Sequence, residues 1–101
     1  MSLLEEENRL VLDVVQAALG LISPQIRALS VALDSGRVVL YVAVSERNAE
    51  VDEDIDDLLF ELEALQDGPI VIESSIFVGR PDAHWPGSSG RRVYLAKEAD
   101  S

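Results

Sequence analysis

An acidic segment with helical periodicity, residues 46–67, constrains the fold of this chain more than any other feature. The segment carries ten carboxylates and one cation, Arg47. Its apolar residues recur at the three- and four-residue spacing of a single buried helix face. The members of this apolar stripe are Val51, Ile55, Leu58, Leu59, Leu62 and Leu65. The pattern predicts one helix that buries the stripe and turns a dense negative face to solvent.

The composition is typical of one folded, strongly acidic domain. A chain of 101 residues can bury one core, and a hydrophobic fraction of 48% is too high for disorder. We therefore expect a single domain over residues 1–101, with a frayed tail at about 97–101. The net charge of −11 predicts no binding of nucleic acid, because affinity for phosphates comes from Lys and Arg. An anionic membrane surface is disfavoured for the same reason.

The chain has no cysteine, which excludes disulfides, thiol chemistry and Cys-ligated metals. Its first residues are acidic, whereas a secretory signal begins with positive charge followed by an apolar stretch. No run of the sequence approaches the roughly 18 apolar residues of a membrane span. We expect a cytoplasmic protein.

The N-terminal segment is a second predicted helix, ending at about Leu19. Ser2 and Glu5 form a capping box at its start, and Gly20 is suited to cap its end. Its apolar face is broad, because Val11, Leu12 and Val15 widen a stripe formed by other residues. A face of this width predicts packing against a sheet and against something else besides, such as a second copy of the protein.

Four strands complete the predicted element order α-β-β-α-β-β. They cover residues 28–33, 38–44, 70–78 and 92–96. The second is apolar on both faces, which is typical of a central strand. The fold class is α+β: a single four-stranded, mainly antiparallel sheet covered on one face by two helices. The acidic helix is either a right-handed crossover between neighbouring second and third strands or a link between two hairpins, and both topologies stay open.

The acidic helix also imitates the spacing of a calcium-binding loop. Asp52, Asp54, Asp56 and Glu63 follow the EF-hand pattern, but Asp57 occupies the position that requires glycine. The apolar stripe also requires this segment to be helical. We predict a solvated helix face, with no metal and no cofactor.

The loop at residues 79–90 contains the single histidine and the single tryptophan of the chain. His84 has no nucleophile or second ligand beside it in a recognisable motif, so we predict that the protein is not an enzyme. A ligand-binding domain that uses this loop is an alternative. Trp85 either folds back over the edge of the core or anchors a partner.

Basic residues flank the same loop and oppose the charge of the acidic helix. They are Arg80, Arg91, Arg92 and Lys97. Ion pairs within the molecule would explain this polarity, and so would dimerisation through opposite charges.

In three stretches, residues 17–27, 60–66 and 91–98, the chain resembles a family of small acidic bacterial proteins. These are the immunity proteins encoded beside bacterial toxins, in contact-dependent inhibition and other polymorphic toxin systems. The resemblance implies a cytoplasmic protein that binds and occludes a basic toxin domain, often a nuclease. Contact residues in such proteins differ from pair to pair, so no binding residue is transferred by alignment.

Charge and resemblance together predict the residues that bind the toxin. The carboxylates expected to meet Lys or Arg of the toxin are Asp52, Asp54, Asp56, Asp57, Glu61 and Glu63. Trp85 and Tyr94 are the expected anchors. The alternative is a homodimeric acidic scaffold that associates through the first helix or an exposed strand edge.

Overall fold

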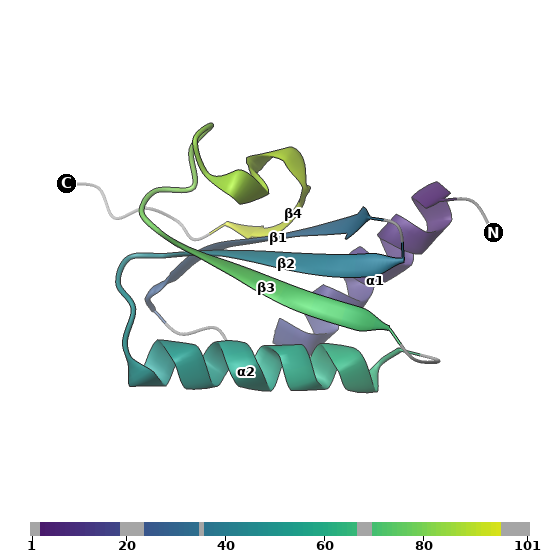
Figure 1. Cartoon of the computed structure of the whole chain (residues 1–101), viewed down its shortest axis with the longest axis horizontal. Helices are drawn as coiled ribbons and strands as arrows, with labels where there is room; N and C mark the ends of the chain where they lie inside the picture. Colours follow the sequence, from purple (N-terminus) through teal and green to yellow (C-terminus); the bar gives the residue numbers. More distant parts are fainter. Residues whose placement is uncertain (1–2, 19–23, 35, 67–69, 96–101) are drawn as a thin grey trace.

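Two helices lie against the same face of a four-stranded sheet in the computed structural model of the chain (Figure 1). The structure describes residues 3–18, 24–34, 36–66 and 70–95. Its elements are α1 (Leu3–Ala18), β1 (Ile26–Asp34), β2 (Arg37–Val44), α2 (Ala49–Ala64), β3 (Val71–Val78), the 3₁₀ turn η1 (Pro86–Ser89) and β4 (Arg91–Leu95). The predicted α+β class and the order α-β-β-α-β-β are confirmed.

The strand order in the sheet is β3-β2-β1-β4. β1 is antiparallel to both β2 and β4, as expected for a mainly antiparallel sheet. β2 and β3 are parallel neighbours, in register from Arg37 opposite Val71 to Val44 opposite Val78, so the sheet is mixed. α2 is therefore the crossover between two parallel strands, and the topology with two hairpins is wrong. β2 is central, as its two apolar faces predict.

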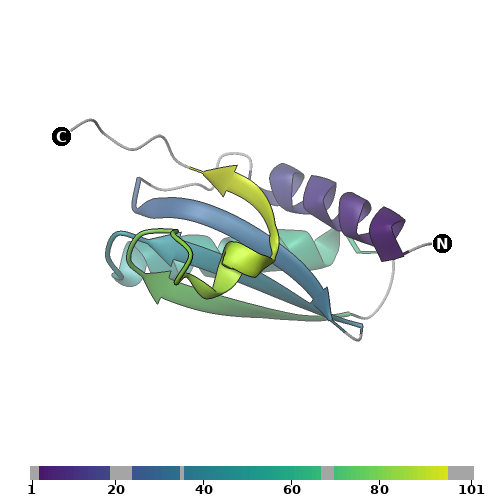
Figure 2. The same ribbon diagram turned by 90° about the horizontal axis from the view of Figure 1, so that it is seen from above.

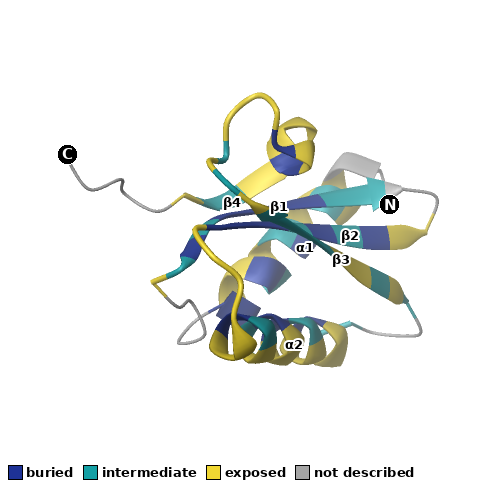
Figure 3. Ribbon diagram, turned by 60° about the vertical axis from the view of Figure 1, so that its left-hand side comes forward, coloured by how far each residue is buried: buried dark blue, intermediate teal, exposed yellow. Residues whose placement is uncertain are grey.

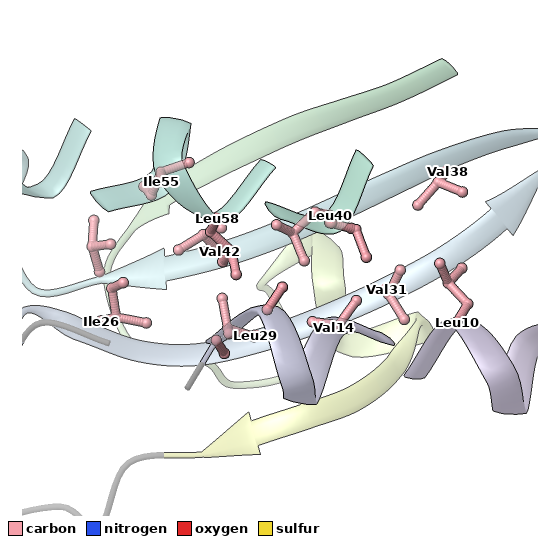
Figure 4. Packing of buried hydrophobic residues seen from close by; sticks show 14 of the residues in the cluster. Leu10, Val14, Ile26, Leu29, Val31, Val38, Leu40, Val42, Ile55 and Leu58 are labelled. Atoms are coloured by element: carbon pink, nitrogen blue, oxygen red, sulfur yellow. The ribbon is translucent and has the colours of Figure 1, made fainter. Parts of the chain in front are cut away.

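The main core fills the space between the sheet and the two helices (Figure 4). Leu10 and Val14 enter it from α1, and Ile55 and Leu58 enter it from α2. The strands contribute Ile26, Leu29, Val31, Val38, Leu40, Val42 and Val44. Full burial of each such side chain contributes about 1.5–3 kcal/mol to folding. The helical and the alternating strand patterns of the sequence therefore converge on this layer.

Residues 79–90 fold back over the opposite face of the sheet (Figures 1 and 2). There Trp85 forms a second, smaller cluster with Ala28 of β1 and Ala43 of β2. Tyr41 and Phe77 pack against this cluster. The sheet therefore has helices on one face and a short loop on part of the other.

The broad apolar face of α1 divides into a buried and an exposed part. Leu10 and Val14 are 5% and 0% exposed, whereas Leu12 and Val15 are 68% and 43% exposed. The helix therefore uses only part of its predicted apolar face to pack on the sheet and α2.

Several predicted termini lie outside the described residues. They are the capping residue Ser2, the helix cap Gly20 and the tail at 97–101. Among the helices that are described, none is long and apolar enough to span a membrane.

Candidate partner-binding surface

The acidic segment forms α2, and its start is fixed by local hydrogen bonding. The side chain of Asn48 accepts a hydrogen bond of 2.9 Å from the backbone N–H of Val51, which caps the helix. Glu50 and Asp52 lie in the first turn, where the positive end of the helix dipole favours carboxylates.

The apolar stripe turns α2 so that its carboxylates face outward. Val51, Ile55, Leu58 and Leu62 are each exposed by 1% or less. The opposite half of the helix is exposed (Figure 3). Four of the predicted partner-binding carboxylates lie on this outward half, namely Asp56, Asp57, Glu61 and Glu63. We call these four residues the outward carboxylates.

Asp52 and Asp54 are less exposed than the outward carboxylates and lie on the flanks of α2. Asp52 accepts a hydrogen bond of 2.9 Å from Nε of Arg47, which pairs its charge at the start of the helix. An exposed pair of this kind contributes only about 0–1 kcal/mol. Arg47 would therefore compete with a partner for Asp52.

The outward carboxylates form no ion pair with any residue in the described part of the chain. The last turn of α2 carries no basic residue, although the negative end of the helix dipole favours cations there. The cations within the described ranges therefore leave the charge of this face uncompensated, and mutual repulsion along the helix opposes folding.

Phe60 is a residue of this surface that the sequence analysis missed. It is 72% exposed, in the middle of α2. The signal was present, because Phe60 falls outside the three- and four-residue spacing of the buried stripe. An aromatic residue that breaks the stripe of an amphipathic helix is directed to solvent.

Trp85 does not belong to the same surface. Its side chain is 1% exposed and lies on the face of the sheet opposite to α2. This burial agrees with the alternative of a ring that folds back over the core, and a role for Trp85 as an anchor stays a prediction. The small side chains of Ala28 and Ala43 leave the space that the indole fills.

Tyr94 is also separated from the outward carboxylates. It is partly buried on β4, opposite Leu29 of β1, and packs against the main core. β4 and β3 form the two edges of the sheet, and α2 contacts β3. The predicted binding residues are therefore not all brought together by the fold.

Two of the basic residues that flank the loop lie apart from α2, and Lys97 lies outside the described residues. Arg91 and Arg92 are exposed on β4, at the edge of the sheet farthest from β3. Within the described ranges, neither arginine forms an ion pair with a carboxylate of α2. The negative charge of α2 and the positive charge of these two arginines therefore lie on separate parts of the surface.

The loop around His84 lies apart from the described cavity of the protein. His84 is exposed, and its backbone N–H donates a hydrogen bond of 2.9 Å to Oδ1 of Asp82. A cavity of about 320 Å³ lies elsewhere, lined by Arg9, Leu33 and Gln66 among others, and His84 is not part of its wall. This cavity therefore gives no support to the ligand-binding alternative at His84.

Residues 49–64 form a helix, so their carboxylates are not arranged as they would be in a calcium-binding loop. Asp54 lies about 200° around the helix from both Asp52 and Asp56, because successive helical residues are about 100° apart. Among the described residues, no three His, Cys, Asp or Glu side chains are placed to hold a metal ion.

A model of a known protein family matches most of the chain. The family model described as MafI2 immunity protein matches residues 7–98. The chain belongs to the MafI2 immunity protein family. The matched region includes both helices almost completely and the whole sheet. A search of curated proteins gives no match.

Membership of this family confirms the resemblance to immunity proteins of polymorphic toxin systems. It implies that the partner of the chain is a toxin. The family places the chain in a class of binding proteins, and the absence of enzymatic activity stays a prediction. The cytoplasmic location also stays a prediction.

Proposed function

We propose that this immunity protein neutralises a basic toxin domain by covering it with the outward half of α2. The observation that supports the proposal is the uncompensated charge of the outward carboxylates, which no described cation pairs. The core does not require these side chains, because the opposite side of the helix supplies the burial. A partner that brings Lys and Arg to this face relieves the repulsion.

A nuclease is the toxin class that this surface fits best. Enzymes that act on nucleic acid bind the phosphate backbone through Lys and Arg. The carboxylates along α2 would present their negative charge to the basic groove in which such an enzyme binds nucleic acid. The helix and the sheet behind it then exclude the substrate by their volume.

Charge on this face acts mainly on the rate of association. Complementary surfaces steer two proteins toward productive encounter, and the effect falls as salt is added. The lifetime of the complex depends instead on what is buried at the interface.

The test removes charge from α2 and compares it with an equal removal elsewhere. The double variant Asp57→Asn/Glu61→Gln neutralises two outward carboxylates, and Glu6→Gln/Glu7→Gln neutralises two carboxylates of α1. Association with a cognate toxin domain is measured by stopped flow at several salt concentrations. We expect the α2 variant to associate about three- to tenfold more slowly at low salt, with a flatter salt dependence.

Two results would contradict the proposal. Unchanged association of the α2 variant would exclude electrostatic steering by this face. An equal effect of the α1 variant would assign the steering to net charge alone.

A homodimeric scaffold is the second candidate, favoured by the exposed Leu12 and Val15 on α1. It predicts that sedimentation velocity shows a concentration-dependent dimer, which Leu12→Gln/Val15→Gln abolishes. A chain that stays monomeric at every concentration would exclude it.

A further inference from the structure

Phe60 is the most exposed large hydrophobic side chain in the described part of the chain, at 72%. It belongs to neither hydrophobic cluster of the protein. Leu58 and Leu62 of the buried stripe are each two residues away, which is about 200° around a helix. The ring is therefore directed away from the sheet, and the fold makes no use of it.

The immediate helical neighbours of Phe60 are acidic. Asp56 and Asp57 lie four and three residues before it, and Glu63 lies three residues after it. Residues at these spacings are adjacent on a helix surface. All three carboxylates are exposed, as is the ring between them. The outward half of α2 thus has an apolar centre and an acidic rim.

We infer that Phe60 is the anchor that buries itself in the toxin, in an apolar pocket rimmed by Lys and Arg. The inference rests on the proposed function, because it takes the outward half of α2 as the toxin-binding surface. Its basis is charge complementarity around an apolar centre. Interfaces commonly place an aromatic anchor at the centre and charged groups at the rim.

A basic rim also suits the ring itself. A guanidinium or ammonium group that pairs with Asp56 or Asp57 lies close to the face of Phe60, where it gains from cation–π attraction. The apolar stems of Lys and Arg provide further surface for the ring to contact. An acidic or purely polar pocket would leave both the ring and the carboxylates without suitable partners.

The anchor and the rim act on different rates. The rim carboxylates increase association, whereas burial of Phe60 slows dissociation. This separation makes the inference testable independently of the proposed function.

The experiment compares Phe60→Ala with Leu12→Ala, which removes an apolar side chain that is 68% exposed on the other helix. Both variants are measured for melting temperature and for association with and dissociation from a cognate toxin domain. Poly-L-lysine serves as a probe that carries charge but no pocket. Phe60→Tyr keeps the ring.

We expect Phe60→Ala to dissociate at least tenfold faster, a change of about 1.4 kcal/mol in binding. Its association rate, its melting temperature and its binding to poly-L-lysine should stay close to those of the parent chain. Phe60→Tyr should restore slow dissociation, and Leu12→Ala should change neither rate.

Unchanged dissociation of Phe60→Ala would overturn this inference and leave the proposed function in place, provided that the carboxylate variant still slows association. A lower melting temperature or weaker poly-L-lysine binding would also overturn it, because the ring would then act through the helix. If the parent chain does not bind the toxin domain, the proposed function itself fails.

Discussion

The hydroxyl of Ser30 on β1 donates a hydrogen bond of 2.6 Å to the carbonyl oxygen of Gly87 in η1, across 57 positions of the chain. Both residues are buried. The bond joins the loop at residues 79–90 to the face of the sheet that the helices leave uncovered. It lies beside the cluster that holds Trp85.

Ser30→Ala should destabilise the protein by about 1–3 kcal/mol, because it leaves the buried carbonyl of Gly87 without its hydrogen-bond donor. The midpoint of urea unfolding measures the change. Ser74→Ala is the matched control, since Ser74 is exposed on β3. Equal midpoints for the two variants would show that the bond is not important for stability.

Gly87→Ala should destabilise the fold by overpacking. A Cβ at this position would lie 2.5 Å from Cζ2 of Trp85 and 2.6 Å from Cβ of Tyr41. Relief of such contacts costs about 1–3 kcal/mol and displaces the indole. Unfolding should therefore occur at lower urea, and the Trp emission should shift to the red.

Gly36→Ala is the informative comparison for Gly87. Nothing lies within 4 Å of an added Cβ there, but the backbone φ of +78° is unfavourable for a side chain. We expect a loss of about 1–2 kcal/mol without a change in Trp emission. If the emission of Gly36→Ala also shifted to the red, the shift would not be a specific report of local packing at Trp85.

The emission of Trp85 should not respond to the toxin. It is the single Trp of the chain, so its fluorescence reports one site, and its side chain is 1% exposed. Acrylamide should quench it weakly, both in the free protein and in a complex with a toxin domain whose own Trp residues are replaced. A large change on binding would return Trp85 to the set of contact residues.

Glu61→Lys should stabilise the protein and weaken its binding to the toxin. The change places a cation in the last turn of α2, four residues after Asp57, where both the helix dipole and a side-chain pair favour it. We expect a gain of about 0.5–1 kcal/mol in thermal unfolding.

Glu50→Lys is the control for Glu61→Lys, because it makes the same charge change in the first turn, where the dipole opposes a cation. If both variants gain equally, relief of net charge explains the effect and the position on the helix does not. If Glu61→Lys associates with the toxin more slowly while its fold is unchanged, then the carboxylate that destabilises the helix also contributes to toxin binding.

The core could be predicted from the sequence because the apolar residues of each helix and strand recur at the period of that element. The stripe from Val51 to Leu62 and the alternation from Leu29 to Val31 specify which side of each element is buried. Strand order could not be predicted in this way. β3 has Glu73 and Ser74 in its middle, which is explained by its place at the edge of the sheet.

The exposure of Trp85 and of Phe60 was predicted less well than the core, for opposite reasons. Trp85 stands in a loop without periodicity, and its burial depends on small residues of two distant strands, Ala28 and Ala43. Those alanines, on the strand faces opposite to the main core, were the available hint that something large fills the space. Phe60 stands in a strongly periodic helix, and its exposure follows from its position off the stripe.

Because α2 is the crossover between β2 and β3, one side of the helix packs on the sheet and the other side faces solvent. Four inward residues hold it to the sheet, and the parallel strands β2 and β3 fix where it begins and ends. The outward residues can then change without repacking the interior. A lineage that must recognise a succession of altered toxins can diversify at those positions alone, one substitution at a time, while its scaffold is inherited intact.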